Sequence, residues 1–299
     1  MTLSLHNMLA TTALLLCGAT PWAASATGFS GGHANLGEPL HIPIADPDGH
    51  PWTLQGRLCR PVGVHRPRVV VIAHGSPANA ADRPGMTLET CDGESARWFL
   101  HRHYAVALVL RLGYGATGGP WSEGYDGCER ADYAKAGLET ARQLKTIVAF
   151  VTALPGNSPN GAIVVGQSAG GWGTLAYNSL PHPNVSAFVN MAGGRGGHFH
   201  NLPNSNCHPD KLIEAAATFG KSASTPMLWI YTANDSFFGP PLAAALHRAF
   251  TEAGGRAMLV TPGAYGEDGH HLFFGHGGSA IWGPSVERYL ASVDTNESQ

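Results

Sequence analysis

The chain has 299 residues, of which 43% are hydrophobic and 13% are charged, and its formal net charge is -3. This length fits one large α/β domain or two small ones, and the hydrophobic content is too high for a disordered chain. The charged fraction is about half of that in average globular domains, and no cationic surface is available for a phosphate backbone or an anionic membrane. Nucleic acid is therefore not expected as a partner.

The first residues have the features of an export signal. The apolar run from Met8 to Ala19 is too short to span a bilayer, and a small-x-small cleavage site, Ala24-Ser25-Ala26, follows it. Cleavage after Ala26 predicts a signal peptide at residues 1–26, one domain at residues 27–299 and a secreted or periplasmic protein without stable membrane insertion. An uncleaved anchor is the alternative, because no Lys or Arg precedes the apolar run.

After the signal, strand-like apolar runs alternate with helical patterns. This alternation predicts a mostly parallel sheet with helices on both faces. No helix separates the first two strand-like runs, so an antiparallel pair is expected at the start of the sheet. The predicted strands are Leu40–Ile44, Trp52–Cys59, Arg68–Ala73, Ala105–Arg111, Ala162–Gly166, Val185–Met191, Pro226–Thr232 and Ala257–Thr261. The predicted helices are Glu94–His103, Tyr133–Ala153, Ala169–Leu180, Pro209–Phe219, Pro241–Ala253 and Ser279–Val293.

The strongest local signal is a G-x-S-x-G pentapeptide, Gly166 to Gly170, between a predicted buried strand and a predicted helix. In this context Ser168 lies on a tight turn with its hydroxyl exposed as a nucleophile. The amide of Ala169 lies at the helix N-terminus, where it can bind a developing oxyanion. A chance match in a glycine-rich chain is the alternative, which the strand before and the helix after the motif disfavour.

A nucleophilic serine needs a base and a carboxylate that orients the base. Asp235 directly follows the seventh predicted strand, and His270 and His271 lie in the loop after the eighth. Their positions after predicted strands favour these catalytic roles over the alternatives, which are an Asp that stabilises a turn and two histidines on the surface. Adjacent side chains point to opposite sides of the backbone, so only one histidine can face Ser168. We predict His270, because Gly269 can adopt the positive φ that turns the loop sharply.

A second oxyanion donor is expected in the loop that begins His74-Gly75-Ser76-Pro77, after the third predicted strand. Pro77 has no N–H, so the amide of Ser76 is the predicted donor. His74 is expected to support the loop rather than to titrate in catalysis.

Together these motifs resemble the α/β-hydrolase superfamily, and within it the dienelactone hydrolase-like and serine aminopeptidase-like branch. The resemblance extends from about Arg68 to Phe274 and rests in part on the segment Arg111 to Gly119 within it. It implies an α/β-hydrolase fold with an eight-stranded, mostly parallel sheet, a triad of Ser168, Asp235 and His270, and no cofactor. Dienelactone hydrolases have a cysteine nucleophile where this chain has serine, so dienelactone is not the expected substrate.

Residues on loops at the same edge of the predicted sheet are candidates for substrate binding. We select Tyr114, Arg195 and Phe237, with ordinary packing as the alternative for each. Glycines flank Arg195, which allows its guanidinium to approach a ligand carboxylate. Trp121, Phe238 and Tyr265 also belong to these loops.

Export predicts disulfides for the four cysteines that follow the signal peptide, with buried free thiols as the alternative. We expect a Cys91–Cys128 disulfide, since both residues fall near one edge of the predicted sheet, and Cys59 pairs with Cys207 only by exclusion.

A metal site is not predicted. His198, His200 and His208 could present imidazoles to zinc or copper, but no nearby carboxylate or H-E-x-x-H helix accompanies them.

The sequence therefore predicts an exported serine hydrolase that cleaves carboxylic esters through an acyl-enzyme. A serine peptidase is the alternative, and a metal-dependent enzyme or a non-catalytic binding protein is less favoured. The expected substrate is a small-molecule ester or a short peptide, and ester is preferred because a single domain has no propeller or large cap to select peptides. The sequence does not predict an oligomeric state.

Overall fold

The structure, a computed structural model, describes residues 35–297 of the chain, and side chains as far as residue 294. The predicted signal peptide lies outside the described residues, and its cleavage stays a prediction. Within the described part of the chain, no helix combines the length and the apolar character needed to cross a membrane.

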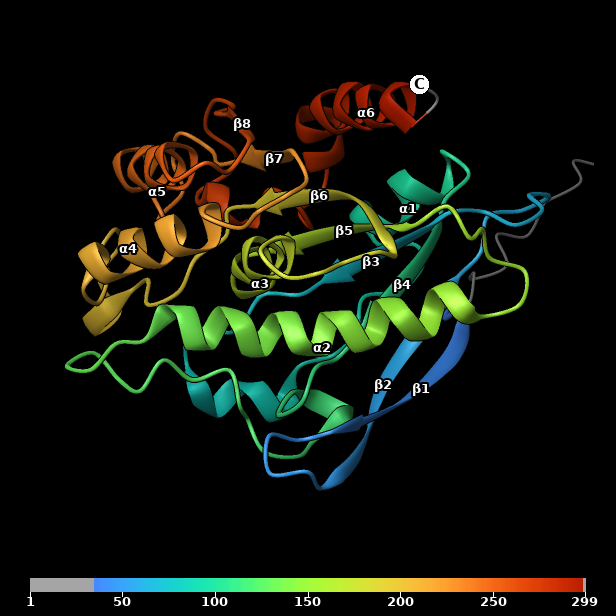
Figure 1. Cartoon of the computed structure of the whole chain (residues 1–299), viewed down its shortest axis with the longest axis horizontal. Coiled ribbons are helices and arrows are strands. Elements are labelled where there is room, and N and C mark those ends of the chain that lie inside the picture. Colours follow the sequence, from blue (N-terminus) through green and yellow to red (C-terminus); the bar gives the residue numbers. More distant parts are fainter. Residues whose placement is uncertain (1–34, 298–299) are drawn as a thin grey trace, which may run out of the picture. The chain divides into compact units, whose positions relative to one another are not determined.

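An eight-stranded sheet forms the centre of the fold (Figure 1). Its strand order is β1-β2-β4-β3-β5-β6-β7-β8. The pair β1–β2 is antiparallel, as the sequence predicts. The pair β2–β4 is also antiparallel, and all other neighbours are parallel. The strands are β1 (Glu38–Ala45), β2 (Pro51–Cys59), β3 (Val69–Ala73), β4 (Ala105–Val109), β5 (Ala162–Gln167), β6 (Val185–Met191), β7 (Met227–Ile230) and β8 (Ala257–Val260).

Six α-helices cover the two faces of the sheet. They are α1 (Glu94–Leu100), α2 (Tyr133–Ala153), α3 (Ala169–Asn178), α4 (Pro209–Gly220), α5 (Pro240–Glu252) and α6 (Gly278–Glu297). Helices α2 to α5 share an apolar core with one face, and α1 and α6 pack on the other (Figure 1). In β3, Val69 and Val71 belong to the first core, whereas Val70 and Ile72 belong to the second. This alternation buries both faces of the strand, which explains its continuous apolar sequence.

The loops at the carboxyl ends of the parallel strands carry four short 3₁₀ helices, which are η1 (Ala80–Gly85), η2 (Gly115–Thr117), η3 (Phe199–Asn201) and η4 (Gly269–His271). Because parallel strands direct their carboxyl ends to the same edge, these loops meet there. The sequence-predicted site residues therefore come from segments far apart in the chain.

The predicted Cys91–Cys128 disulfide is wrong. The structure pairs Cys59 with Cys91, with Cα atoms 5.6 Å apart, and Cys128 with Cys207, with Cα atoms 5.4 Å apart. Cys59 lies opposite Val106 at the beginning of β4, where α1 leads into the sheet. Cys128 and Cys207 instead lie on loops that follow β4 and β6. The error arose because Cys91 and Cys128 lie toward opposite ends of the strands.

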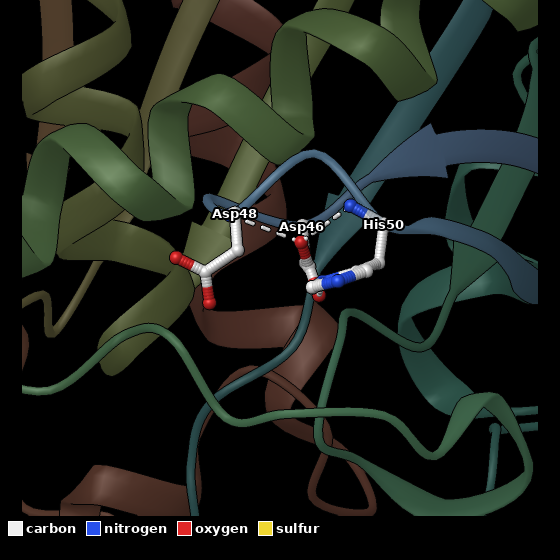
Figure 2. A group of neighbouring side chains, drawn as sticks. All are labelled: Asp46, Asp48 and His50. Atoms are coloured by element: carbon white, nitrogen blue, oxygen red, sulfur yellow. Dashed lines mark hydrogen bonds and ion pairs between the residues drawn. The ribbon is translucent and has the colours of Figure 1, made fainter.

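A cluster of polar side chains occupies the β1–β2 hairpin turn, far in sequence from the motifs described above. Figure 2 shows Asp46, Asp48 and His50, whose possible ligand atoms lie within 4.8 Å of one another. Asp46 Oδ1 accepts hydrogen bonds from the amides of Asp48 (3.0 Å) and His50 (2.8 Å), and Asp46 Oδ2 accepts from Trp52 Nε1 (3.2 Å). Asp46 thus has the role of an Asx residue that stabilises its own turn.

Candidate active site

Ser168 lies between β5 and α3 in a backbone conformation that is strained for a residue with a side chain. Its φ is 53° and its ψ is -118°. The turn is tight: a Cβ atom at Gly170 would lie 2.2 Å from the carbonyl oxygen of Ala73 in β3. Only glycine fits there, and the same holds for Gly166, where a Cβ atom would lie 2.3 Å from the carbonyl oxygen of Gly170.

His270 and Asp235 form a buried pair beside the serine turn. His270 Nδ1 lies 3.1 Å from Asp235 Oδ2, and the two side chains are 5% and 0% exposed. Asp235 Oδ1 accepts hydrogen bonds from the amides of Phe237 and Phe238, both at 2.8 Å. These bonds fix the carboxylate, so His270 Nδ1 is held as the donor and Nε2 is left for another partner.

Of the two adjacent histidines, only His270 contacts Asp235. The His271 side chain is 72% exposed, and its Nε2 lies 4.0 Å from Asp268 Oδ2. The predicted reason for the glycine before them is wrong: Gly269 does not have a positive φ. A Cβ atom there would lie 1.8 Å from Thr232 Oγ1, so close approach to the loop after β7 requires glycine.

Two further residues fix the loop that carries His270. Asp268 Oδ1 accepts from the amides of His270 and Ser236, both at 3.0 Å, and Gln167 Nε2 donates to the His270 carbonyl at 3.0 Å. Burial alone would raise the pKa of Asp268, but hydrogen bonds from Ser236 and the His270 amide hold it below its usual range. Asp268 therefore stays ionised as a cap for the turn. Sequence reasoning did not identify Gln167 as a residue that holds this loop.

The loop after β3 lies against the serine turn. A Cβ atom at Gly75 would lie 2.4 Å from Gln167 Oε1 and 3.1 Å from Ser168 Cβ. His74 Nε2 accepts from the amide of Arg111 (3.2 Å), so its proton is on Nδ1, which lies 2.6 Å from the Gly75 carbonyl oxygen. Burial, together with the charge of Arg111, lowers the pKa of His74 to about 3. His74 is a neutral support of the loop, as the sequence predicts.

Two cavities meet at Ser168, and they differ in polarity. The larger cavity, of about 440 Å³, is lined mainly by apolar side chains such as Met86, Leu88 and Phe274, together with Ser168 and His270. We call it the apolar pocket. The smaller cavity, of about 130 Å³, contains the polar side chains of two arginines and we call it the polar pocket. The residues that line both are Ser76, Pro77, Ala78, Ser168 and Phe237.

Phe237, predicted to bind substrate, lines both pockets. Its ring stacks on His270 with the ring centroids 4.2 Å apart, and on its other neighbour His198 with the centroids 3.7 Å apart. The predicted oxyanion donors also lie here: Ser76 lines both pockets and Ala169 lines the polar pocket. The amide of Ala169 belongs to the first turn of α3, where N–H groups have no acceptor within the helix.

A buried charge cluster lies beneath the polar pocket. Glu123 is 0% exposed and accepts hydrogen bonds from Arg111 Nε and Arg195 Nη2, the latter at 2.7 Å. Arg111 Nη1 also donates to the His74 carbonyl at 2.9 Å. Burial alone would raise the pKa of Glu123, but the two guanidinium groups hold it well below its usual range. The cluster therefore holds an ionised carboxylate between two cations and connects it to the loop of His74.

Tyr114, predicted to bind substrate, belongs to this cluster instead. It is 0% exposed, lines neither pocket at Ser168, and donates its hydroxyl to Glu123 Oε2 at 3.0 Å. The structure therefore favours the packing alternative over substrate binding for Tyr114, because the ionised carboxylate of Glu123 in the interior needs the phenol as a hydrogen-bond donor. Arg195 lines the polar pocket, with one of its nitrogens bound to Glu123, and its role in substrate binding stays a prediction.

The histidines considered as metal ligands do not meet. His198 Nε2 lies 2.8 Å from Ser236 Oγ, and His208 Nδ1 lies 3.7 Å from Asp210 Oδ1. Among residues 35–294, the only group of three side chains spaced to hold an ion is that of the hairpin in Figure 2.

The fold and the site geometry together define an α/β-hydrolase fold with a serine, a histidine and an aspartate at the carboxyl edge of its sheet. Solved structures with this fold confirm the predicted resemblance at the level of the fold. Acylaminoacyl peptidase from Pyrococcus horikoshii matches with a TM-score of 0.57 at 14% identity, over 80% of this chain and 38% of that one. This chain thus spans well under half of the peptidase.

Two esterases match over nearly their whole length. Est1E from Butyrivibrio proteoclasticus has a TM-score of 0.54 at 14% identity, over 86% of this chain and 99% of that one. The esterase Pf2001 from Pyrococcus furiosus has a TM-score of 0.55 at 14% identity, over 85% of this chain and 90% of that one. No protein-family model and no curated protein matches the chain.

Proposed function

We propose that the protein is a serine hydrolase that cleaves carboxylic esters through an acyl-enzyme intermediate. The observation that carries this proposal is the buried His270–Asp235 pair at 3.1 Å, whose histidine lines the same pocket as the strained Ser168. The esterases and the peptidase that share the fold support a hydrolase, and the two esterases resemble this chain over most of their length.

In the proposed reaction, Ser168 Oγ attacks the ester carbonyl carbon and transfers its proton to His270 Nε2. Asp235 accepts from His270 Nδ1 and stabilises the imidazolium. The amides of Ser76 and Ala169 bind the oxyanion of the tetrahedral intermediate. The C–O bond then breaks, and His270 returns the proton to the leaving alcohol. Water attacks the acyl-enzyme by the same proton transfers in reverse, which releases the acid and restores Ser168.

Substitution of the two adjacent histidines tests the proposed base against a matched control. His270→Gln should lower kcat by about 10⁴-fold or more, as Ser168→Ala should, because either change removes the nucleophile–base pair. His271→Gln should keep most of the activity, since His271 is 72% exposed and does not contact Asp235. The activity of all three variants is measured as hydrolysis of benzyl butyrate, monitored through the benzyl alcohol released.

Full activity in Ser168→Ala would contradict the proposed function. Activity lost in His271→Gln and kept in His270→Gln would assign the base to the other histidine. Peptide cleavage is the alternative activity, and aminoacyl p-nitroanilides assayed beside the esters distinguish it: a kcat/KM higher for the anilides would contradict the ester assignment.

We also propose that the protein is exported. Two disulfides fit an oxidising compartment, where such bonds form and persist. N-terminal sequencing of the protein recovered outside the cytoplasm should begin at Thr27, after the predicted cleavage site; a start at Met1 would favour the uncleaved anchor.

A further inference from the structure

The polar pocket beside Ser168 contains more positive than negative charge. Arg83 and Arg195 line it, and none of the described residues that line it is acidic. The carboxylate of Glu123, which contacts Arg195, is shared by Arg111 and Arg195. Arg83 has no carboxylate partner among the described residues, and its guanidinium carbon lies 3.4 Å from the centroid of the Trp121 ring. Three guanidinium groups therefore face one carboxylate.

Donor groups in this pocket also lack acceptors. Arg195 is 5% exposed, and only its Nη2 donates to described residues, to Glu123 at 2.7 Å and Thr140 at 3.0 Å. Arg195 Nε is buried without a hydrogen-bond partner, and so is Arg83 Nε. Buried donors normally have acceptors, and those of a guanidinium are matched best by a carboxylate. Two arginines with unpaired Nε donors line one small cavity, which indicates that its ligand is negatively charged.

The position of His270 indicates which half of an ester enters the polar pocket. In the proposed reaction the leaving oxygen takes its proton from His270, so the alcohol half must lie beside that imidazole. His270 lines the apolar pocket and does not line the polar one. Ser168 and Ala169 do line the polar pocket, and the acyl group stays attached to Ser168 after the alcohol leaves. The acyl half is therefore assigned to the polar pocket.

We propose that the polar pocket binds a carboxylate on the acyl half of the substrate, which makes the preferred substrate a monoester of a short dicarboxylic acid with an apolar alcohol. This inference rests on the proposed function and deepens it. A cavity of about 130 Å³ holds only a small group, such as a succinyl chain, whereas the 440 Å³ apolar pocket accepts a larger alcohol. Arg83 is the principal contact, because Glu123 already occupies part of Arg195.

Two benzyl esters of similar size test the charge, and a third, smaller ester tests its placement. Benzyl hydrogen succinate carries the carboxylate on the acyl half, benzyl 4-methylpentanoate replaces the carboxylate by an isosteric isopropyl group, and carboxymethyl butyrate carries the carboxylate on the alcohol half. The hydrogen succinate should have a kcat/KM about tenfold or more above that of the neutral ester, since charged hydrogen bonds are among the strongest in proteins. Equal values for these two esters, or a preference for carboxymethyl butyrate, would overturn the proposal.

Variants of Arg83 connect the preference to the pocket. Arg83→Gln should lower kcat/KM for benzyl hydrogen succinate by about 10- to 100-fold, and for the neutral ester by less than about threefold, because only the former loses a charged contact. Arg83→Lys should keep part of the preference. Arg248→Gln, which removes an exposed charge on α5, is the matched control and should change neither value. Equal losses on both esters in Arg83→Gln would contradict the assignment.

A binding measurement separates this inference from the proposed function. Succinate should alter the tryptophan fluorescence of the full protein, because Trp121 lies against Arg83, and the change should be lost in Arg83→Gln. Binding without hydrolysis of any ester would reject the proposed function and support the pocket. Hydrolysis of neutral esters, with neither succinate binding nor a preference for the hydrogen succinate, would reject the pocket and leave the proposed function standing.

Discussion

Replacement of Glu123 by alanine should strongly destabilise the fold. Glu123 is 0% exposed and lies between Arg111 and Arg195, whose side chains are 0% and 5% exposed. Without the carboxylate, two guanidinium groups remain buried with no counter-charge, and loss of one partner from a buried pair costs about 3–5 kcal/mol. For a domain of this size each kcal/mol corresponds to about 2–4 °C, so Tm should fall by about 10 °C.

A surface glutamate provides the control for this substitution. Glu287 is 61% exposed and lies 3.4 Å from Arg102, and exposed pairs contribute about 0–1 kcal/mol. Glu287→Gln should therefore leave Tm within about 2 °C of the parent value. Thermal unfolding followed by circular dichroism measures both variants. A Glu123→Ala protein as stable as Glu287→Gln would refute the idea that the carboxylate neutralises the buried arginines.

The pH dependence of the same difference follows from the pKa of Glu123. Burial alone would raise this pKa, but Arg111 and Arg195 hold it below its usual range in the folded state. A carboxyl whose pKa is lowered by folding contributes stability that is fully present at a pH above its pKa in the unfolded state. This stability is lost as the pH falls through its pKa in the folded state. The Tm difference between parent and Glu123→Ala should therefore be constant from pH 5 to pH 8 and shrink only under strongly acidic conditions.

Two further predictions concern a partly buried acid, Glu89, and the disulfides. Burial raises the pKa of the Glu89 carboxyl to about 7 from 4.5, so its contribution to stability is present below the unfolded value and is lost as the pH rises through 7. The parent Tm should therefore fall between pH 5 and pH 8 relative to that of Glu89→Gln, and parallel curves would contradict this. Peptide mapping without reduction should recover Cys59 with Cys91 and Cys128 with Cys207, and loss of the second disulfide should cost about 2–5 kcal/mol.

The eight strands and six helices were predictable because each is a local property of the sequence. Buried parallel strands such as β3 and β5 are continuous apolar runs, and amphipathic helices such as α2 have their own period. The positions of Ser168, Asp235 and His270 were predictable for a related reason. Parallel strands direct their carboxyl ends to one edge, so the loops that follow those strands meet there.

The contacts that sequence reasoning missed join residues without any local pattern. Glu123 is 72 residues from Arg195 and 12 from Arg111, and nothing near it marks it as the buried partner of both. Tyr114 was assigned to the substrate for the same reason, since its loop was correctly placed but its partner was unknown. The predicted cysteine pairing was wrong because pairing depends on the end of β4 at which each cysteine-bearing loop lies, and the sequence does not show this.

The missed contacts are also those that give the site its chemical character. A serine turn, a histidine and an aspartate are common to many hydrolases, and none of them selects a substrate. Here one carboxylate, Glu123, binds arginines from the loops after β4 and β6, and Arg111 extends this contact to the His74 carbonyl after β3. The cluster thus supports the loop of the proposed oxyanion donor Ser76 and, because it contains one carboxylate, leaves positive charge beside Ser168. If both consequences hold, Glu123→Gln should impair turnover of the neutral ester through the loop and that of the anionic ester less, because it also frees Arg195 for the substrate carboxylate. Arg83→Gln should instead impair mainly the anionic ester.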